Sequence, residues 1–229
     1  MPGRTNRAGR CQAGPVRVQP ITPRAAVHEL AELITGRSTP GRAVRVLVDG
    51  APAADPGTWA DALVDPLRLR GRPVLRASAA DFLRPASLRL EFGRHNPHSL
   101  LAGWFDLGAL RRELLEPLGA GGSGRVLLRW WDPTADRSAR AEYVTAPDGA
   151  VLVVDGSLLL GAGLPVELSV HLHLSEGALR RRTPAGEDWT LPAYHEYARQ
   201  VRPAATADVV LLVDHPDRPA LTHPQRERM

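Results

Sequence analysis

The sequence predicts an α/β protein with a doubly wound, mostly parallel, five-stranded sheet and a small β-hairpin insertion. Three observations support this prediction. Short apolar runs alternate along the chain with segments of helical periodicity. These runs are continuously apolar rather than alternating, as in parallel strands that are buried on both faces. Gly and Asp residues follow several of the runs, where strands turn into loops.

The first expected element is a helix over residues 24–35. Thr22 offers a hydroxyl as its N-cap, and Pro23 lies in the first turn, where a missing N–H is tolerated. Further helices are expected over residues 56–70, 107–118, 175–182 and 188–201.

The five strands of the sheet are expected over residues 43–50, 72–77, 149–155, 166–172 and 207–214. Two further strands, residues 125–131 and 139–144, flank a polar turn at 132–136. Strands joined by such a turn predict a hairpin inserted into the α/β domain.

The chain divides into four predicted regions. They are a basic, disordered leader (1–21), an N-terminal helix with a linker (22–41), the α/β domain (42–214) and a C-terminal tail (215–229). All 29 basic residues are arginine, against 25 acidic residues, and the formal net charge is +4. Five arginines precede the first acidic residue, Glu29, so the rest of the chain is nearly neutral. A nucleic-acid binder carries its excess charge on the folded body, so no nucleic-acid partner is expected.

Composition excludes several kinds of chemistry. Without lysine the chain has no amine for a Schiff base. A single cysteine, Cys11, excludes a disulfide framework. The pairs His95/His98 and His171/His173 have no third ligand near them in sequence, so no protein-bound metal is expected. No run reaches the roughly 18 apolar residues of a membrane span. We therefore expect a cytoplasmic protein without a membrane partner; its oligomeric state stays open.

Candidate site residues lie at the predicted strand ends, because ligands of such sheets bind beyond the carboxyl ends of the strands. These positions are Asp49-Gly50, Ser78 to Asp81, Asp155-Gly156 and Asp214.

Several segments, taken in their order along the chain, carry a family resemblance. They are residues 46–50, 76–85, 105–110, 115–118, 150–156, 179–182 and 207–210. Together they resemble the uridine kinase family of P-loop nucleoside kinases, particularly its members from high-GC bacteria. The resemblance covers about residues 42–214 and implies a sheet of P-loop NTPase type.

The resemblance implies transfer of a phosphoryl group from ATP, with Mg²⁺, to a nucleoside of the uridine or cytidine class. It implies Asp81 as general base, Asp155 at Mg²⁺ or its water, and Arg181 as a catalytic lid residue. The implied cofactor-binding residues are Gly50, Gly57, Thr58, Arg180 and Arg182. The implied substrate-binding residues are Asp81, Arg84, Arg89 and Trp131.

Each of these residues also fits a structural role. Asp81 fits a helix N-cap, and Asp155 fits a strand-end turn. The arginines at 180–182 fit a solvated helix face. At least one of Trp130 and Trp131 fits a hydrophobic core.

Residues 50–58 depart from the phosphate-binding pattern G-x-x-x-x-G-K-[ST]. Asp55, Pro56 and Gly57 stand at the second glycine, the lysine and the hydroxyl residue. Proline offers neither an N–H nor a charge, and Asp55 is negative where a triphosphate would lie. Asp-Pro is also a good helix start. Three hypotheses remain open. The first is a nucleoside kinase in which arginines replace the lysine and ATP is the donor. The second is a non-catalytic protein, without a cofactor, that binds a nucleoside, nucleotide or protein partner in the retained pocket. The third is a regulatory or scaffolding protein whose arginine-rich leader does the binding.

Overall fold

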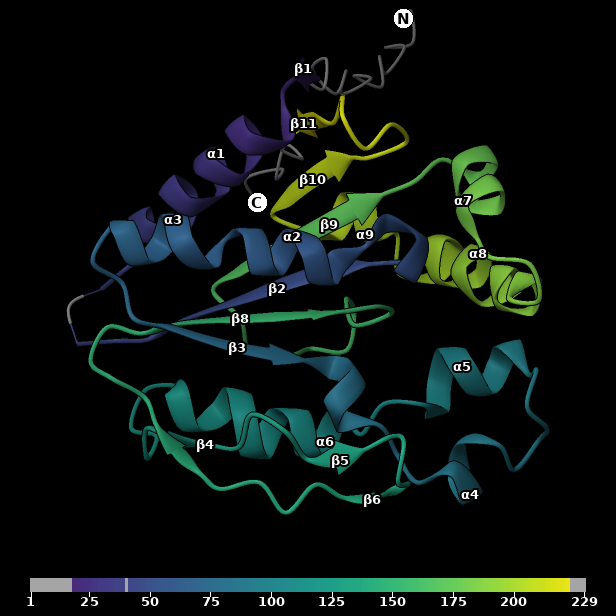
Figure 1. Cartoon of the computed structure of the whole chain (residues 1–229), viewed down its shortest axis with the longest axis horizontal. Helices are drawn as coiled ribbons and strands as arrows, with labels where there is room; N and C mark the ends of the chain where they lie inside the picture. The colour runs from purple at the N-terminus through teal and green to yellow at the C-terminus, as the bar shows by residue number, and fades with distance from the viewer. Residues whose placement is uncertain (1–17, 40, 223–229) are drawn as a thin grey trace, which may run out of the picture.

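The computed structural model describes residues 18–39 and 41–222 and centres on a seven-stranded sheet (Figure 1). The strand order is β1-β11-β10-β9-β2-β8-β3. Their bounds are β1 Gln19–Pro20, β2 Val44–Gly50, β3 Val74–Ser78, β8 Val151–Gly156, β9 Leu168–His173, β10 Val209–Leu212 and β11 Ala220–Thr222. The five strands β10, β9, β2, β8 and β3 pair in parallel, which confirms the predicted parallel sheet.

Strand β2 lies inside the sheet, paired with β8 on one side and β9 on the other. Val46 lies opposite Val153 of β8 and Leu168 of β9. Every residue of β2 is buried, because helices cover both faces of the sheet. This double burial is why its sequence is continuously apolar rather than alternating.

The sheet has two further strands at one side, β11 and the edge strand β1, that the sequence does not predict. β11 pairs antiparallel with β10, and β1 pairs antiparallel with β11, with Gln19 opposite Leu221. Both strands fall within the regions predicted as leader and tail. Strands of two and three residues are too short to leave a periodic pattern. The rest of the predicted leader (1–17) and of the tail (223–229) lies outside the described residues.

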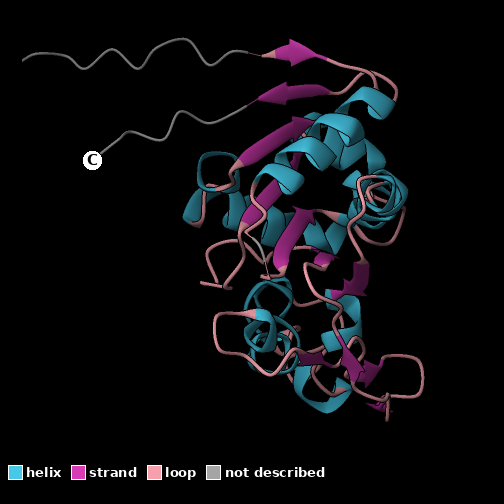
Figure 2. Ribbon diagram, turned by 90° about the vertical axis from the view of Figure 1, so that its left-hand side faces the viewer, coloured by secondary structure: helices cyan, strands magenta, loops and turns pink. Residues whose placement is uncertain are grey.

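Helices lie on both sides of the sheet (Figure 2). One face carries α1, α2 and α3, and the other carries η3 and α8 among others. The bounds are α1 Pro23–Gly36, α2 Pro56–Ala62, α3 Val64–Leu69, α4 Ala86–Arg89, α5 Pro97–Gly103, α6 Leu107–Ala109, α7 Glu176–Arg182, α8 Leu191–Gln200 and α9 Pro203–Thr206. Short 3₁₀ turns are η1 Pro52–Ala54, η2 Ala79–Phe82, η4 Glu116–Leu118 and η5 Asp188–Thr190, and η3 Leu110–Leu115 is a π-helix.

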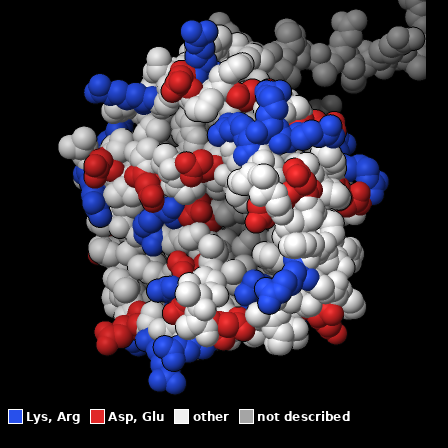
Figure 3. Space-filling model, turned by 45° about the vertical axis from the view of Figure 1, so that its right-hand side comes forward, with Lys and Arg blue, Asp and Glu red and all other residues white. Residues whose placement is uncertain are grey.

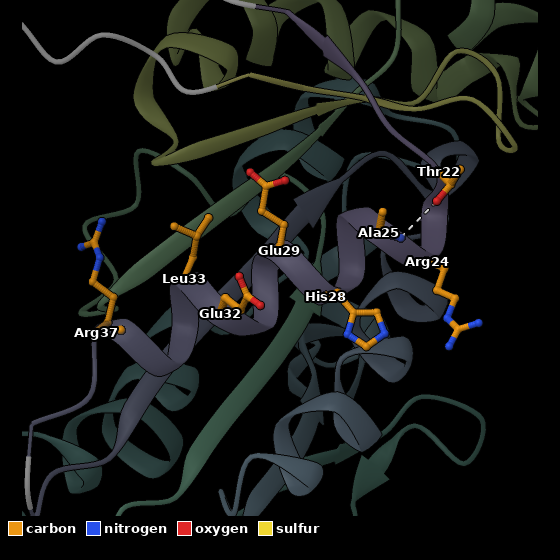
Figure 4. A pocket seen from close by; sticks show the side chains of 9 residues that line it. Thr22, Arg24, Ala25, His28, Glu29, Glu32, Leu33 and Arg37 are labelled. Atoms are coloured by element: carbon orange, nitrogen blue, oxygen red, sulfur yellow. Dashed lines mark hydrogen bonds between the residues drawn. The ribbon is translucent and has the colours of Figure 1, made fainter.

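Two of the predicted helices are divided. The helix expected over 56–70 breaks at Leu63 into α2 and α3, because Pro66 has no N–H to donate to the carbonyl of Ala62. The helix expected over 107–118 is formed by α6, η3 and η4 in succession. Helix α1 starts as predicted: Thr22 Oγ1 accepts the N–H of Ala25 at 3.2 Å (Figure 4).

The predicted hairpin is confirmed, with shorter strands. β5 Trp131–Asp132 pairs with β6 Arg137–Ser138, and β4 Arg125–Val126 pairs with β7 Val144–Thr145. These ribbons lie at the end of the molecule away from β1 and β11 (Figures 1 and 2). Among the described residues, no helix combines the length and the apolar composition that crossing a membrane requires.

Candidate functional site

A cavity of about 830 Å³ opens at the carboxyl ends of β2, β3 and β8, and we call it the edge cavity. Each of these strands contributes to its lining, through Gly50, Ser78 and Asp155. Figure 3 shows this side of the molecule, hollowed near its middle with acidic and basic side chains around the hollow. The cavity therefore lies where an α/β sheet of this kind places its ligand.

The edge cavity brings together only some of the residues predicted from sequence. Gly50, Gly57, Arg89 and Asp155 line it. The other predicted residues, all of them described, are not among its lining: Thr58, Asp81, Arg84, Trp131, Arg180, Arg181 and Arg182.

The loop between β2 and α2 directs its N–H groups inward. The N–H of Ala54 donates to the carbonyl of Ala51 at 2.7 Å, and the N–H of Asp55 donates to the carbonyl of Pro52 at 2.9 Å. Pro52 and Pro56 have no N–H. The N–H of Thr58 donates to the carboxylate of Asp55, so the helix N-terminus is already capped. Few backbone donors are left for a phosphate.

Asp55 is the N-cap of α2, and it holds a left-handed backbone with φ 57°. Its side chain accepts from Thr58 N at 3.3 Å and places a carboxylate at the positive end of the helix. Pro56 follows at the first helical position. This is the helix start that the sequence predicts as the structural role of these residues. The carboxylate of Asp55, an anion, lies at the helix N-terminus where a phosphate would bind.

Arg76 of β3 is a central residue of the site that sequence reasoning missed. Its Nη1 lies 2.6 Å from Asp155 Oδ1, and its Nε donates to Asp61 Oδ1 at 2.8 Å. Its Nη2 donates to the carbonyl of Gly57 at 3.3 Å, and Nη1 also donates to the carbonyl of Ala77. The guanidinium thus ties α2 to β3 and β8, and its donors are almost fully used. The sequence carries no signal for this role, because Asp61 and Asp155 lie on other elements.

Asp155 is nearly buried; within the described residues its Oδ1 has an ion-pair partner but no hydrogen bond, and its Oδ2 has a hydrogen bond. Oδ1 faces Arg76, and Oδ2 accepts the hydroxyl of Ser78 at 3.2 Å. The residues present do not fit Mg²⁺·ATP at this place: the carboxylate is neutralised by a guanidinium, and Asp55 faces the phosphate position. Among the described residues, no group of three or more His, Cys, Asp or Glu side chains is placed to hold a metal ion.

The arginines at 180–182 do not converge on one point. Arg180 lies 3.7 Å from Glu176 of the same helix, and Arg182 Nη1 donates to the carbonyl of Val213 at 2.8 Å. Arg181 is exposed. Arg182 and Thr58 both line a separate depression of about 540 Å³ beside α1 and α2.

The remaining predicted substrate residues have structural partners. Arg84 Nη1 donates weakly to the carbonyl of Gly103 at 3.5 Å, and Trp131 Nε1 donates to Asp136 at 3.2 Å within the hairpin. Asp81 does not cap a helix, because Ser78 is the N-cap of η2 and accepts the N–H of Ala80 at 3.3 Å. The alternative role predicted for Asp81 is therefore wrong.

Asp81 pairs with Arg129, whose Nε lies 3.0 Å from Oδ1. Partial burial nevertheless raises the pKa of Asp81, because the lost hydration outweighs the attraction of Arg129. A raised carboxyl pKa is what a general base needs, but Asp81 does not face the edge cavity.

The Asp81→Asn variant is expected to gain stability relative to the wild type as the pH rises from about 3 to 7. Since the folded-state pKa is raised, the stabilising contribution of the carboxyl group is complete below its unfolded pKa and is lost as the pH rises through the folded value. Asn does not titrate. The difference should be a few tenths of a kcal/mol, because solvent screens this half-exposed group. Urea unfolding across this pH range measures it, and a difference that stays constant with pH would contradict the assignment.

One wall of the edge cavity is aromatic. The rings of Trp104 and Trp189 lie 5.7 Å apart, and His95 lies 5.4 Å from Trp189. The guanidinium of Arg89 sits over Trp104 at 5.4 Å and is held by Asp136 and the carbonyl of Arg84. Trp104 Nε1 is buried without a hydrogen-bond partner among the described residues. Of these residues the sequence singled out only Arg89 for the pocket, because the aromatic residues lie in loops and helix ends without a periodic pattern.

A wider depression of about 1030 Å³ runs along α1 between Thr22 and Arg37 (Figure 4). Its polar side chains, such as Arg24, His28 and Glu32, project outward from one helix and do not converge on a point. It is the outer face of α1 rather than a site.

Comparison with solved structures identifies the fold. The chain superposes on a possible uridine kinase from Bacillus stearothermophilus with a TM-score of 0.66 and 20% identity, covering 82% of this chain and 97% of that one. It superposes on a protein assigned as a fructose transport system kinase from Silicibacter sp. TM1040 with a TM-score of 0.52 and 20% identity, covering 78% and 90%. No family model and no curated protein sequence matches the chain. The chain has the fold of the uridine kinase-like P-loop kinases.

Proposed function

We propose that this chain is a uridine kinase-like protein that binds a nucleoside or nucleotide in the edge cavity and does not bind ATP at residues 50–58. The observation that carries the proposal is the loop itself. The N–H groups of Ala54 and Asp55 bond within the loop, and the Asp55 carboxylate caps α2 where a phosphate would lie. The partner on this proposal is a small molecule, and neither a nucleic acid nor a membrane is involved.

The edge cavity supports a nucleoside-class ligand by its size and chemistry. Its volume of about 830 Å³ falls in the range of small-molecule sites. Trp104, Trp189 and His95 offer flat surfaces on which a base can stack. Asp136 and Arg89 at the same wall offer acceptors and donors for the ligand's polar edges.

Phosphoryl transfer from ATP to a nucleoside is the second candidate. Thr58 and Arg182, two of the residues that the family resemblance assigns to ATP, line one depression beside α2. ATP held there would lie outside the loop, with an arginine in place of the lysine. On this alternative ATP binds, and its affinity falls when Arg182 is removed.

Tryptophan fluorescence and calorimetry should detect uridine at micromolar to millimolar concentrations and no ATP·Mg²⁺ at several millimolar. Trp189→Ala should weaken uridine binding about 10- to 100-fold, since base–aromatic stacking contributes roughly 1–3 kcal/mol. The control is Trp59→Phe, which changes a tryptophan of α2 outside the edge cavity and should leave uridine affinity unchanged.

The outcomes separate the two candidates. ATP binding that depends on Arg182, together with transfer of phosphate to uridine, would establish the kinase and overturn the proposal. Uridine binding that is insensitive to Trp189→Ala would remove the edge cavity as its site.

A further inference from the structure

A second cavity, of about 470 Å³, lies at the carboxyl end of β9 and is lined by residues of α7, α8 and α9. We call it the β9 cavity. Leucine, alanine and tyrosine side chains supply much of its lining, and His171, His173 and His195 are among its polar members. Tyr194 is the one residue that the linings of the β9 cavity and the edge cavity share. The β9 cavity is therefore a compartment distinct from the proposed nucleoside site.

The strand alternation of β9 and β2 places a carboxylate behind one histidine. Leu168, Val170 and Leu172 face α1 to α3, so His171 faces the opposite side of the sheet. Asp49 of β2 points to that same side, and its Oδ2 lies 2.9 Å from His171 Nδ1. Asp49 is fully buried, so only the far edge of the imidazole is left to meet the cavity.

The hydrogen bonds around Asp49 fix the protonation of His171. Asp49 Oδ1 accepts the N–H of Leu159 at 2.9 Å, and Oδ2 accepts the hydroxyl of Tyr197 at 3.1 Å. A carboxylate that accepts these bonds can only accept from His171 as well, so Nδ1 carries the proton. In the neutral ring Nε2 is then an acceptor, and within residues 18–39 and 41–222 no side chain or backbone group bonds to it.

The other titratable groups of the β9 cavity do not favour a charged ligand. Burial lowers the pKa of His173, which favours its neutral form at neutral pH. Glu176 lies 3.8 Å from His195 and 3.7 Å from Arg180. Arg202 adds one positive charge to the lining, against the negative charge of Glu176. These opposite charges leave no strong excess of either sign.

We propose that the β9 cavity binds a neutral, mainly apolar ring molecule that donates one O–H or N–H group to His171 Nε2. The volume is in the range of small-molecule sites. A mainly apolar pocket with one well-oriented polar group is the usual design of such a site. An acceptor in the cavity lining that no described group uses also favours a ligand with a donor over one without.

The test uses p-cresol, a neutral ring with one hydroxyl, and the full chain labelled with ¹⁵N-histidine. Correlation spectra should show His171 protonated at Nδ1 and unprotonated at Nε2 in the free protein. Added p-cresol should shift the Nε2 resonance with a Kd of about 1 mM, as expected for a small fragment. The matched ligand 4-methylanisole has the same ring and no donor, and it should bind at least about 10-fold more weakly.

Variants locate the site independently of His171. Ala198→Phe places a ring in the β9 cavity from the exposed side of α8 and should abolish p-cresol binding while uridine binding is retained. His171→Phe should also abolish it; urea unfolding shows whether this variant is folded. Equal affinity for p-cresol and 4-methylanisole, no shift of the Nε2 resonance, or p-cresol binding that survives Ala198→Phe would each overturn the proposal.

Discussion

Replacement of Asp55-Pro56-Gly57 by Gly-Lys-Thr is expected to create ATP·Mg²⁺ binding at residues 50–58, where the proposed function places none. The substitution restores the pattern G-x-x-x-x-G-K-T from Gly50 onward. It removes the carboxylate that occupies Thr58 N, returns an N–H at position 56, and adds the amine that the chain lacks. Each charge-assisted hydrogen bond contributes roughly 1.5–3 kcal/mol, so affinity should improve at least about 100-fold.

The local backbone accommodates these changes. Residue 55 has φ 57°, which glycine adopts more easily than aspartate. A Cβ added at Gly57 would meet Asp155 Oδ2 at 3.9 Å, an ordinary contact, so the backbone at residue 57 accepts a side chain. Pro56 is buried, so urea unfolding of the Gly-Lys-Thr variant shows whether it is folded.

Calorimetry with ATP·Mg²⁺ measures the gain. The matched control replaces the same residues by Gly-Ala-Thr, which opens the loop without adding the amine and should recover only part of the affinity. If the natural chain binds ATP as tightly as the Gly-Lys-Thr variant, residues 50–58 are not what excludes the nucleotide, and the proposed function fails at that point.

The central sheet was predictable because its signal is local. Strands β2, β8 and β9 are continuously apolar, and each ends in a polar residue or glycine that marks the loop. The helix start at Asp55 was predictable for the same reason, since a cap depends on residues a few positions apart.

The centre of the site was not predictable, because its contacts join distant parts of the chain. Arg76 acquires its role from Asp61 and Asp155, which lie on a helix and another strand. Trp104 and Trp189 meet across 85 positions of sequence, and neither belongs to a motif. Arg181, in contrast, matches a motif of the uridine kinase family that this sequence resembles, but its side chain is exposed in the structure. A family pattern thus identifies positions, and only the tertiary structure shows which partners they keep.

Substitution of Asp49 by Ala is expected to lower the free energy of unfolding by about 3–5 kcal/mol, the usual cost of removing one partner from a buried charged network. Asp49 has no exposed surface and joins four segments: β2, β9 through His171, α8 through Tyr197, and the loop after β8 through Leu159. Alanine would leave three buried donors without an acceptor, and each such group costs roughly 1–3 kcal/mol.

Asp49→Asn removes the negative charge of residue 49 and keeps the size of its side chain, so it tests the two contributions separately. The amide oxygen can still accept from Leu159, but the amide N–H group faces two donors, His171 Nδ1–H and the Tyr197 hydroxyl. His171 can relieve one clash by moving its proton to Nε2, so the loss should be about 1–3 kcal/mol, smaller than for alanine. Urea unfolding measures both variants, and histidine ¹⁵N spectra of Asp49→Asn should show the changed tautomer. Equal destabilisation by Asn and Ala, with no change of tautomer, would mean that Asp49 acts through its negative charge alone and does not orient His171.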